Sequence, residues 1–183
     1  MKKILTKAKD TGLEFKPDLT PMQMIRLGVF GNNYFVISRK LLIKEFPDTW
    51  KVLIRKKAKD SNYQYTKDTN LFKVESGLSL EEWQSKGWIN DQDPLGWFQW
   101  YCRYYLGRRT TDDERQIKRY KAFIRHSKAC ASQSKGDLSK QTVRRQALLH
   151  WAWDPFPDAK LLPGETTFKK CKRLAKVIAK NKL

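Results

Sequence analysis

The residues best placed to do chemistry lie in one stretch, GWFQWYCRYYLGRRTTDDERQIKRY, at positions 96–120. On a helical period, Gln99 and Arg103 share one face of a segment that is otherwise almost entirely apolar. An isolated buried charge is very costly, so Arg103 must pair with a carboxylate or meet a phosphate or carboxylate of a ligand. Both alternatives are open, and the candidate structural partners are Asp91, Asp93 and Glu114.

Further arginines follow this stretch. Arg108 and Arg109 come directly after Gly107, a typical residue at the end of a helix, and therefore lie on a turn where side chains reach outward. Paired arginines on a turn suit contacts with backbone phosphate, and neither should be needed for helix packing. The predicted nucleic-acid-binding residues are Gln99, Arg103, Arg108, Arg109, Arg115, Arg119, Arg144 and Arg145.

The charge of the chain favours a polyanionic partner. Its 183 residues hold 38 Lys and Arg against 19 Asp and Glu, a net charge of +19. The charge is unevenly distributed along the chain. The net charge of residues 61–120 is zero, whereas residues 121–183 hold fifteen basic and four acidic side chains. Such a distribution favours contact with DNA, RNA or an anionic membrane surface. The basic helix expected near the C-terminus has a modest apolar face without Trp, so we favour nucleic acid, DNA before RNA, and expect no membrane partner.

Catalytic and metal-binding patterns are scarce. The sequence has no P-loop, G-x-S-x-G, H-E-x-x-H or Rossmann fingerprint. Its three cysteines form no CxxC pair and it has two histidines, so we expect no metal and no cofactor. Widely spaced cysteines are typical of reduced thiols, and the N-terminus lacks the apolar region of a signal peptide. These features predict an intracellular protein that is not secreted.

The spacing of apolar residues, together with capping signals, predicts an all-α fold, a compact single-domain bundle of about seven helices. The clearest start signals are Thr20-Pro21 and the capping boxes at 79–82 and 111–114. The expected helices span residues 21–28, 38–45, 48–58, 79–87, 93–107, 111–128, 139–153 and 166 or 167 to near the C-terminus.

Domain organisation follows from composition. We expect a flexible basic segment at 1–19 and a single helical domain over 20–183. The Ser-, Lys- and Gly-rich stretch 127–140 predicts a flexible loop within that domain. The helix at 93–107 is apolar on nearly all sides, which favours a central position in the core over a surface that stacks bases.

Two patterns, TPMQMIRLGVFGNNYF and WQSKGWINDQDPLGWFQWYCRYYLGRRTTDDERQIKRY, resemble a family of uncharacterised proteins that shares the GWFQWYCRYYLGRR core. The resemblance covers approximately residues 20–153 and implies no known activity. The polar residues set among the aromatics exceed what a helical scaffold needs, which keeps an enzyme open as an alternative.

We therefore expect a nucleic-acid-binding protein that grips phosphates with its arginines. One alternative is an enzyme that modifies or repairs bases in an aromatic pocket, where Gln99 and Arg103 read a base removed from its stack. The acidic residue of that enzyme would be Asp91 or Asp113. Another alternative is a basic module that binds an acidic protein partner. A pocket holding Gln99, Arg103 and a carboxylate of raised pKa would favour the enzyme, whereas Arg103 paired in a closed core would exclude it.

Overall fold

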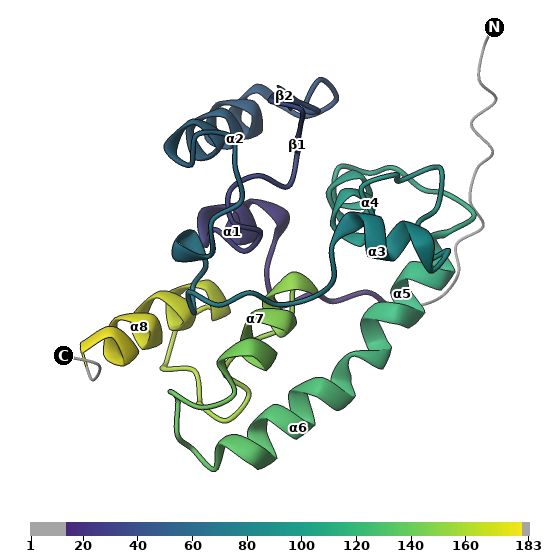
Figure 1. Ribbon diagram of the computed structural model, residues 1–183. Helices are drawn as coiled ribbons and strands as arrows, with labels where there is room; N and C mark the ends of the chain where they lie inside the picture. Colours follow the sequence, from purple (N-terminus) through teal and green to yellow (C-terminus); the bar gives the residue numbers. More distant parts are fainter. Residues whose placement is uncertain (1–13, 181–183) are drawn as a thin grey trace, which may run out of the picture.

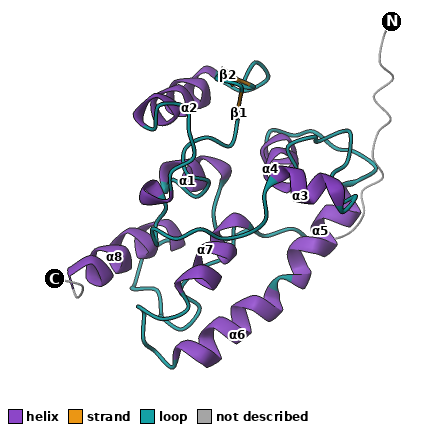
Figure 2. Cartoon of the chain, viewed as in Figure 1, coloured by secondary structure: helices purple, strands orange, loops and turns teal. Residues whose placement is uncertain are grey.

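The structure, a computed structural model, describes residues 14–180, and within them the all-α class is confirmed (Figures 1 and 2). The helices are α1 (Pro21–Arg26), α2 (Asp48–Asp60), α3 (Leu80–Ser85), α4 (Trp97–Tyr105), α5 (Asp113–Ala122), α6 (Ile124–Ser134), α7 (Thr142–His150) and α8 (Thr167–Lys180), with a short 3-10 turn at Lys67–Thr69. In the described part of the chain, no helix is both long and apolar enough to cross a lipid bilayer.

Figure 1 shows how the helices are arranged. α5 and α6 follow each other as one long rod, interrupted at Phe123, and α3 lies beside α5. α4 contacts α1 and α5, and α7 contacts α6. In this view α7 lies between α8 and the α5–α6 rod.

The helix expected at 38–45 is not formed. The strands β1 (Val36–Ile37) and β2 (Lys40–Leu41) pair there as a short antiparallel hairpin. Ser38 and Arg39, which join the strands, have φ angles of 49° and 63°, the positive values that a tight two-residue hairpin turn requires. Ser38 is therefore a turn residue and not the N-cap that its residue type suggested.

The aromatic helix α4 lies in the core, as its pattern predicted. Its residues 97–102 are all buried. The indole Nε1 of Trp100 donates to Asp113 at 2.8 Å, and the hydroxyl of Tyr101 donates to the carbonyl of Leu19 at 2.7 Å. These bonds satisfy the polar atoms of two rings that are almost completely excluded from solvent.

Local signals set some helix starts and fail at others. The capping box formed by Ser79 and Glu82 is confirmed at the start of α3. The box expected at 111–114 is not formed, because α5 begins at Asp113 with Asp112 in the N-cap position and without a side-chain cap. Asp113 accepts hydrogen bonds from the backbone nitrogen and the hydroxyl of Thr110 and from Trp100 of α4.

The segment before α1 is packed onto the core where a flexible extension was expected over 1–19. Residues 1–13 of that prediction lie outside the described part of the chain. The carbonyl of Lys16 accepts from the hydroxyl of Tyr120 at 2.9 Å. The ring of Phe15 has its centre between 4.9 and 6.4 Å from the ring centres of Trp97, Trp100, Tyr101, Tyr104 and Tyr120.

The loop expected near 127–140 is helical over its first half. α6 continues to Ser134, and Ser127, Cys130 and Ser134 are buried along it. The hydroxyl of Ser134 donates to Asp158 at 2.7 Å. The small polar side chains that suggested a loop are therefore packing contacts, and residues 135–141 form the turn that follows α6.

Candidate nucleic-acid interface

Arg103 and Arg108 are structural, because both bind the carboxylate of Asp93. Arg103 Nη1 donates to one oxygen of Asp93 at 2.9 Å, and Arg108 Nη2 donates to the other. Arg103 also forms an ion pair with Glu45 at 2.9 Å. Asp93 is fully buried and pairs with both arginines, and Glu45 supplies the second negative charge of this network. Asp93 does not cap α4 as its position suggested. The prediction that Arg108 is not needed for packing is wrong.

Gln99 is engaged inside the core. Its Oε1 accepts from the backbone nitrogen of Leu95 at 2.9 Å, and the residue is buried. Arg103, the expected partner of Gln99 in reading a base, is held by carboxylates. Asp91 is exposed, whereas Asp113 is buried and bonded to α4. This geometry contradicts the version of the enzyme hypothesis that rests on Gln99 and Arg103.

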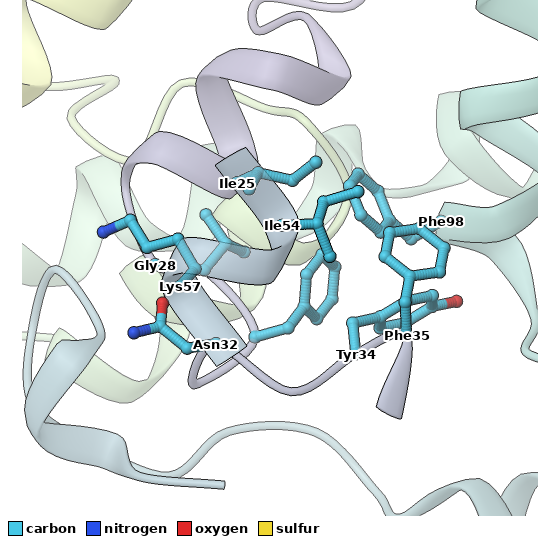
Figure 3. Close-up of a pocket in the computed structure, with 10 residues that line it drawn as sticks. Ile25, Gly28, Asn32, Tyr34, Phe35, Ile54, Lys57 and Phe98 are labelled. Atoms are coloured by element: carbon cyan, nitrogen blue, oxygen red, sulfur yellow. The ribbon is translucent and has the colours of Figure 1, made fainter. Parts of the chain in front are cut away.

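A small hollow lies where α1, α2 and α4 meet (Figure 3). The rings of Tyr34, Phe35 and Phe98 line it, and the polar ends of Asn32 and Lys57 point away from these rings. Its volume is about 30 Å³. Since a water molecule needs about 10–15 Å³ by the same measure, the hollow has room for about two waters and is far too small for a nucleobase.

Arg145 is a buried cation, which contradicts its predicted contact with phosphate. Its guanidinium has no solvent exposure and binds both oxygens of Asp158 at 2.9 Å. It also donates to the backbone carbonyls of Lys140 at 2.9 Å and Pro155 at 2.8 Å. Each nitrogen of the Arg145 guanidinium therefore donates to a carbonyl or carboxylate oxygen within the fold.

Lys170 of α8 is a second buried cation of this kind. It is 2% exposed and pairs with Asp154. Its ammonium also donates to the backbone carbonyls of Phe156 at 3.0 Å and Ala159 at 2.9 Å. Arg145 and Lys170 thus both donate hydrogen bonds to the loop between α7 and α8.

Three of the remaining predicted arginines lie nearer the surface. Arg115 forms a two-point pair with Asp112, so its charge is compensated. Arg109 is exposed and lies 3.7 Å from the ring centre of Tyr104. Arg144 donates to glutamine side chains of α6 and of the residue before α7. Within the described residues, neither Arg109 nor Arg144 forms an ion pair.

Arg119 has a different environment, in which its charge is not compensated. Its guanidinium lies 5.1 Å from the ring centre of Trp83 and 5.3 Å from that of Trp151. It forms no ion pair with a described carboxylate and makes only long hydrogen bonds, such as one of 3.4 Å to the carbonyl of Trp88. Burial, together with the like charge of Arg115, lowers the pKa of Arg119 to about 10, and the charge of Asp112, which pairs with Arg115, only partly opposes this shift. A partly buried cation without a counter-charge favours binding of an anion.

Arg119 lies on a row of aromatic rings that runs from α3 to the junction of α5 and α6. Successive ring centres are 5.5, 6.1, 5.2 and 4.2 Å apart. Trp88, at one end, is 43% exposed, and the other rings are partly exposed. We name this row the ring ladder, and its members in order are Trp88, Trp83, Trp151, Phe123 and His126.

The rod that carries Arg119 also presents exposed cations without carboxylate partners. Lys118 pairs with Glu114. Further along the described rod, no ion pair forms at the exposed side chains of Lys121, Arg125 and Lys128. Burial and, after it, the like charges of Arg125 and Arg144 lower the pKa of His126, so two cations lie near this end of the ring ladder. We use the name α5–α6 surface for the four cations Arg119, Lys121, Arg125 and Lys128.

A shallow, open hollow lies on α5 beside Arg119. The residues that line it are Thr111, Glu114, Arg115, Lys118, Arg119 and Ala122. Three of them are cations and one is a carboxylate. Because Arg119 borders both this hollow and the ring ladder, an anion in the hollow would lie next to exposed aromatic surface.

Other chemistry finds less support in the geometry. His150, the second histidine, is packed on Phe30 and faces the carbonyl of Val29 at 3.0 Å, and burial lowers its pKa to about 4. The three cysteines are free and buried. Among the described residues, no three His, Cys, Asp or Glu side chains gather as a metal site.

Sequence reasoning found part of this interface. Arg119 was among the predicted nucleic-acid-binding residues. The row of Trp83, Trp88 and Trp151 was missed, because Trp151 lies far along the chain from the other two and meets them only in the folded protein. The one sequence signal for this row was the high tryptophan content, because the chain has seven Trp residues and α4 contains only Trp97 and Trp100.

The structure therefore divides the predicted residues into two groups. Arg119, Arg109 and Arg144 remain available at the surface, whereas the buried or paired residues are Gln99, Arg103, Arg108, Arg115 and Arg145. Comparisons with family models, with curated proteins and with solved structures give no significant match. The function is therefore inferred from the geometry of the α5–α6 surface and the ring ladder.

Proposed function

We propose that the protein binds nucleic acid, with DNA favoured over RNA, through the α5–α6 surface. The observation that carries the proposal is the uncompensated charge of Arg119. Other arginines predicted to bind phosphate, such as Arg108 and Arg145, are neutralised by carboxylates of the fold. Arg119 lacks such a partner among the described residues, and its lowered pKa reflects the cost of keeping it charged.

A phosphate supplies the missing counter-charge. A phosphate beside Arg119 would stabilise its charged form and accept several hydrogen bonds from the guanidinium. Lys121, Arg125 and Lys128 add exposed positive charge further along the rod, and at about 3.6 residues per turn they lie on the side of the helix away from Arg119. A polyanion with regularly spaced charges fits this arrangement better than a single small anion does.

The proposal is tested by measuring affinity for DNA and RNA oligonucleotides between about 50 and 200 mM salt. Binding should weaken steeply, because each neutralised phosphate contributes about 0.7 to 0.9 to the slope of log K against log salt. Replacing Lys121, Arg125 and Lys128 together with Gln should make that slope shallower by about 2 to 3. Affinity that does not change with salt would contradict the proposal.

α8 offers a matched control, since Lys172, Lys176 and Lys180 are also exposed. The corresponding triple Gln variant removes the same charge from the chain but leaves the α5–α6 surface intact. It should lower affinity much less than the variant of α5 and α6. Equal losses from the two variants would mean that net charge alone drives binding and that the α5–α6 surface is not the site.

A further inference from the structure

The ring ladder adds to the cationic surface a feature that phosphate binding does not require. Trp88 is 43% exposed and ends the row of rings. Large aromatic side chains are usually covered in the core of a protein of this size, as those at 97–101 in α4 are. Exposed aromatic surface beside unpaired cations is the combination that proteins use to bind unpaired bases.

Trp88 is held firmly although its ring is exposed. Its backbone nitrogen donates to the carbonyl of Trp83 at 3.0 Å, and its own carbonyl accepts from Arg119. The ring packs edge-to-face on Trp83, whose helix begins with a complete capping box. The ring is therefore fixed before a ligand arrives, so stacking on it costs little conformational entropy.

Two cations lie near Trp88, one over its ring and one at its backbone. The ammonium of Lys86 lies 5.6 Å from the ring centre of Trp88, and Arg119 reaches the carbonyl of the same residue. In a nucleic-acid strand a base and its neighbouring phosphates are joined by one sugar. A base stacked on Trp88 would thus place its phosphates near Lys86 and Arg119, which complements both parts of a nucleotide.

We infer that the ligand of this surface is single-stranded nucleic acid, with an unpaired base stacked on the indole ring of Trp88. The inference rests on the proposed function and names its ligand class. In a duplex both faces of each base are covered by the neighbouring base pairs, so the Trp88 ring has nothing to stack on. Every base has an aromatic face that can stack on a ring, so the preference for base sequence should be weak.

The experiment compares three ligands with the same number of phosphates: a thymine oligonucleotide, a duplex, and an abasic strand. The single strand should bind about tenfold more tightly than the abasic strand, which retains the phosphates but has no bases. Binding of the single strand should also quench tryptophan fluorescence, whereas the abasic strand should quench it little. Equal affinity for all three ligands would overturn the inference and leave the proposed function intact.

Two variants assign the effect to one ring. Trp88→Ala should weaken binding of the single strand about tenfold and leave the affinity for the duplex unchanged, while Trp88→Phe should retain most of it. Tyr105→Ala is the matched control, because Tyr105 is 51% exposed and packs near Trp50, outside the ring ladder. Equal losses from Trp88→Ala and Tyr105→Ala would overturn the assignment. Failure of the wild-type protein to bind any of the ligands, with binding of an acidic protein instead, would reject the proposed function as well.

Discussion

Arg108 donates a hydrogen bond to Asp93, a carboxylate with no solvent exposure. Arg103 takes the other oxygen of the same carboxylate. The neighbouring Arg109 turns to the surface instead, where it covers the ring of Tyr104. Two arginines adjacent in the sequence thus have different roles, one inside an ion-pair network and one outside it.

The first prediction compares these two neighbours. Arg108→Ala should lower the free energy of unfolding by about 2 kcal/mol, because it leaves the buried Asp93 with a single cationic partner. Arg109→Ala should lower it by no more than about 1 kcal/mol, the value of an exposed contact between a cation and a ring. Urea unfolding monitored by tryptophan fluorescence measures both. Similar values for the two variants would contradict the described network.

The second prediction concerns the pair Arg145 and Asp158. Arg145→Ala should lower the free energy of unfolding by about 3–5 kcal/mol, because Asp158 would remain in the interior without its partner. Arg144→Ala, one position earlier, should cost less than about 1 kcal/mol, since Arg144 bonds only to glutamine side chains. Thermal unfolding gives the comparison. A stable Arg145→Ala protein would mean that the cation is not buried.

The third prediction is a pH dependence due to His150, whose pKa burial lowers to about 4. The unfolded chain binds a proton on this side chain below its ordinary pKa of about 6.5, while the folded protein does not until about pH 4. The unfolded state is therefore favoured as the pH falls from about 6.5 to 4, and this residue contributes a loss of up to about 3 kcal/mol.

Unfolding in urea at several pH values between 4.5 and 7 tests this dependence. His150→Gln should flatten the profile, because glutamine does not titrate and its amide can still donate to the carbonyl of Val29. His126→Gln is the control for the other histidine and should leave most of the slope. A profile that is the same for His150→Gln and for the wild type would contradict the burial of this ring.

The fourth prediction concerns Phe15, which contacts rings of α4 and α5 from outside the helical domain that the sequence predicted. Phe15→Ala should lower the free energy of unfolding by about 3 kcal/mol, the typical cost of removing an aromatic ring from a packed site. Lys16→Ala should cost less than about 0.5 kcal/mol, because its side chain is exposed. If the two variants are equally stable, residues 14–19 do not belong to the folded domain.

Patterns within a few residues predicted much of this fold. The helical period of α4 indicated a buried helix, and the Ser79 capping box located the start of α3. Local signals were wrong where a distant contact or a turn outweighed them. Ser38 was expected to cap a helix and instead lies at a positive φ in a hairpin turn, and Asp113 is bonded to α4.

The partners of the charged residues could not be predicted from spacing. Arg103 pairs with Glu45, which lies 58 residues earlier, and Arg145 with Asp158 beyond the end of its own helix. An arginine on a partly polar helix face gives the same pattern whether it is paired or free. The candidate site could therefore be predicted only as far as the basic rod, and the ring ladder required the packing of α3 and α7 against it.

The central claim is that Arg119 is an unpaired cation that binds phosphate. The most direct test measures the affinity of the wild type, Arg119→Gln and Arg119→Lys for a single-stranded oligonucleotide over a range of salt concentrations. Stability should change by no more than about 1 kcal/mol in both variants, since no ion pair is lost.

Arg119→Gln should weaken binding about tenfold at moderate salt and reduce the salt slope by about 0.7, the contribution of one phosphate on a single strand. Arg119→Lys, which keeps the charge, should retain the slope and lose part of the affinity. An Arg119→Gln protein that is folded and binds with wild-type affinity and salt slope would contradict the account.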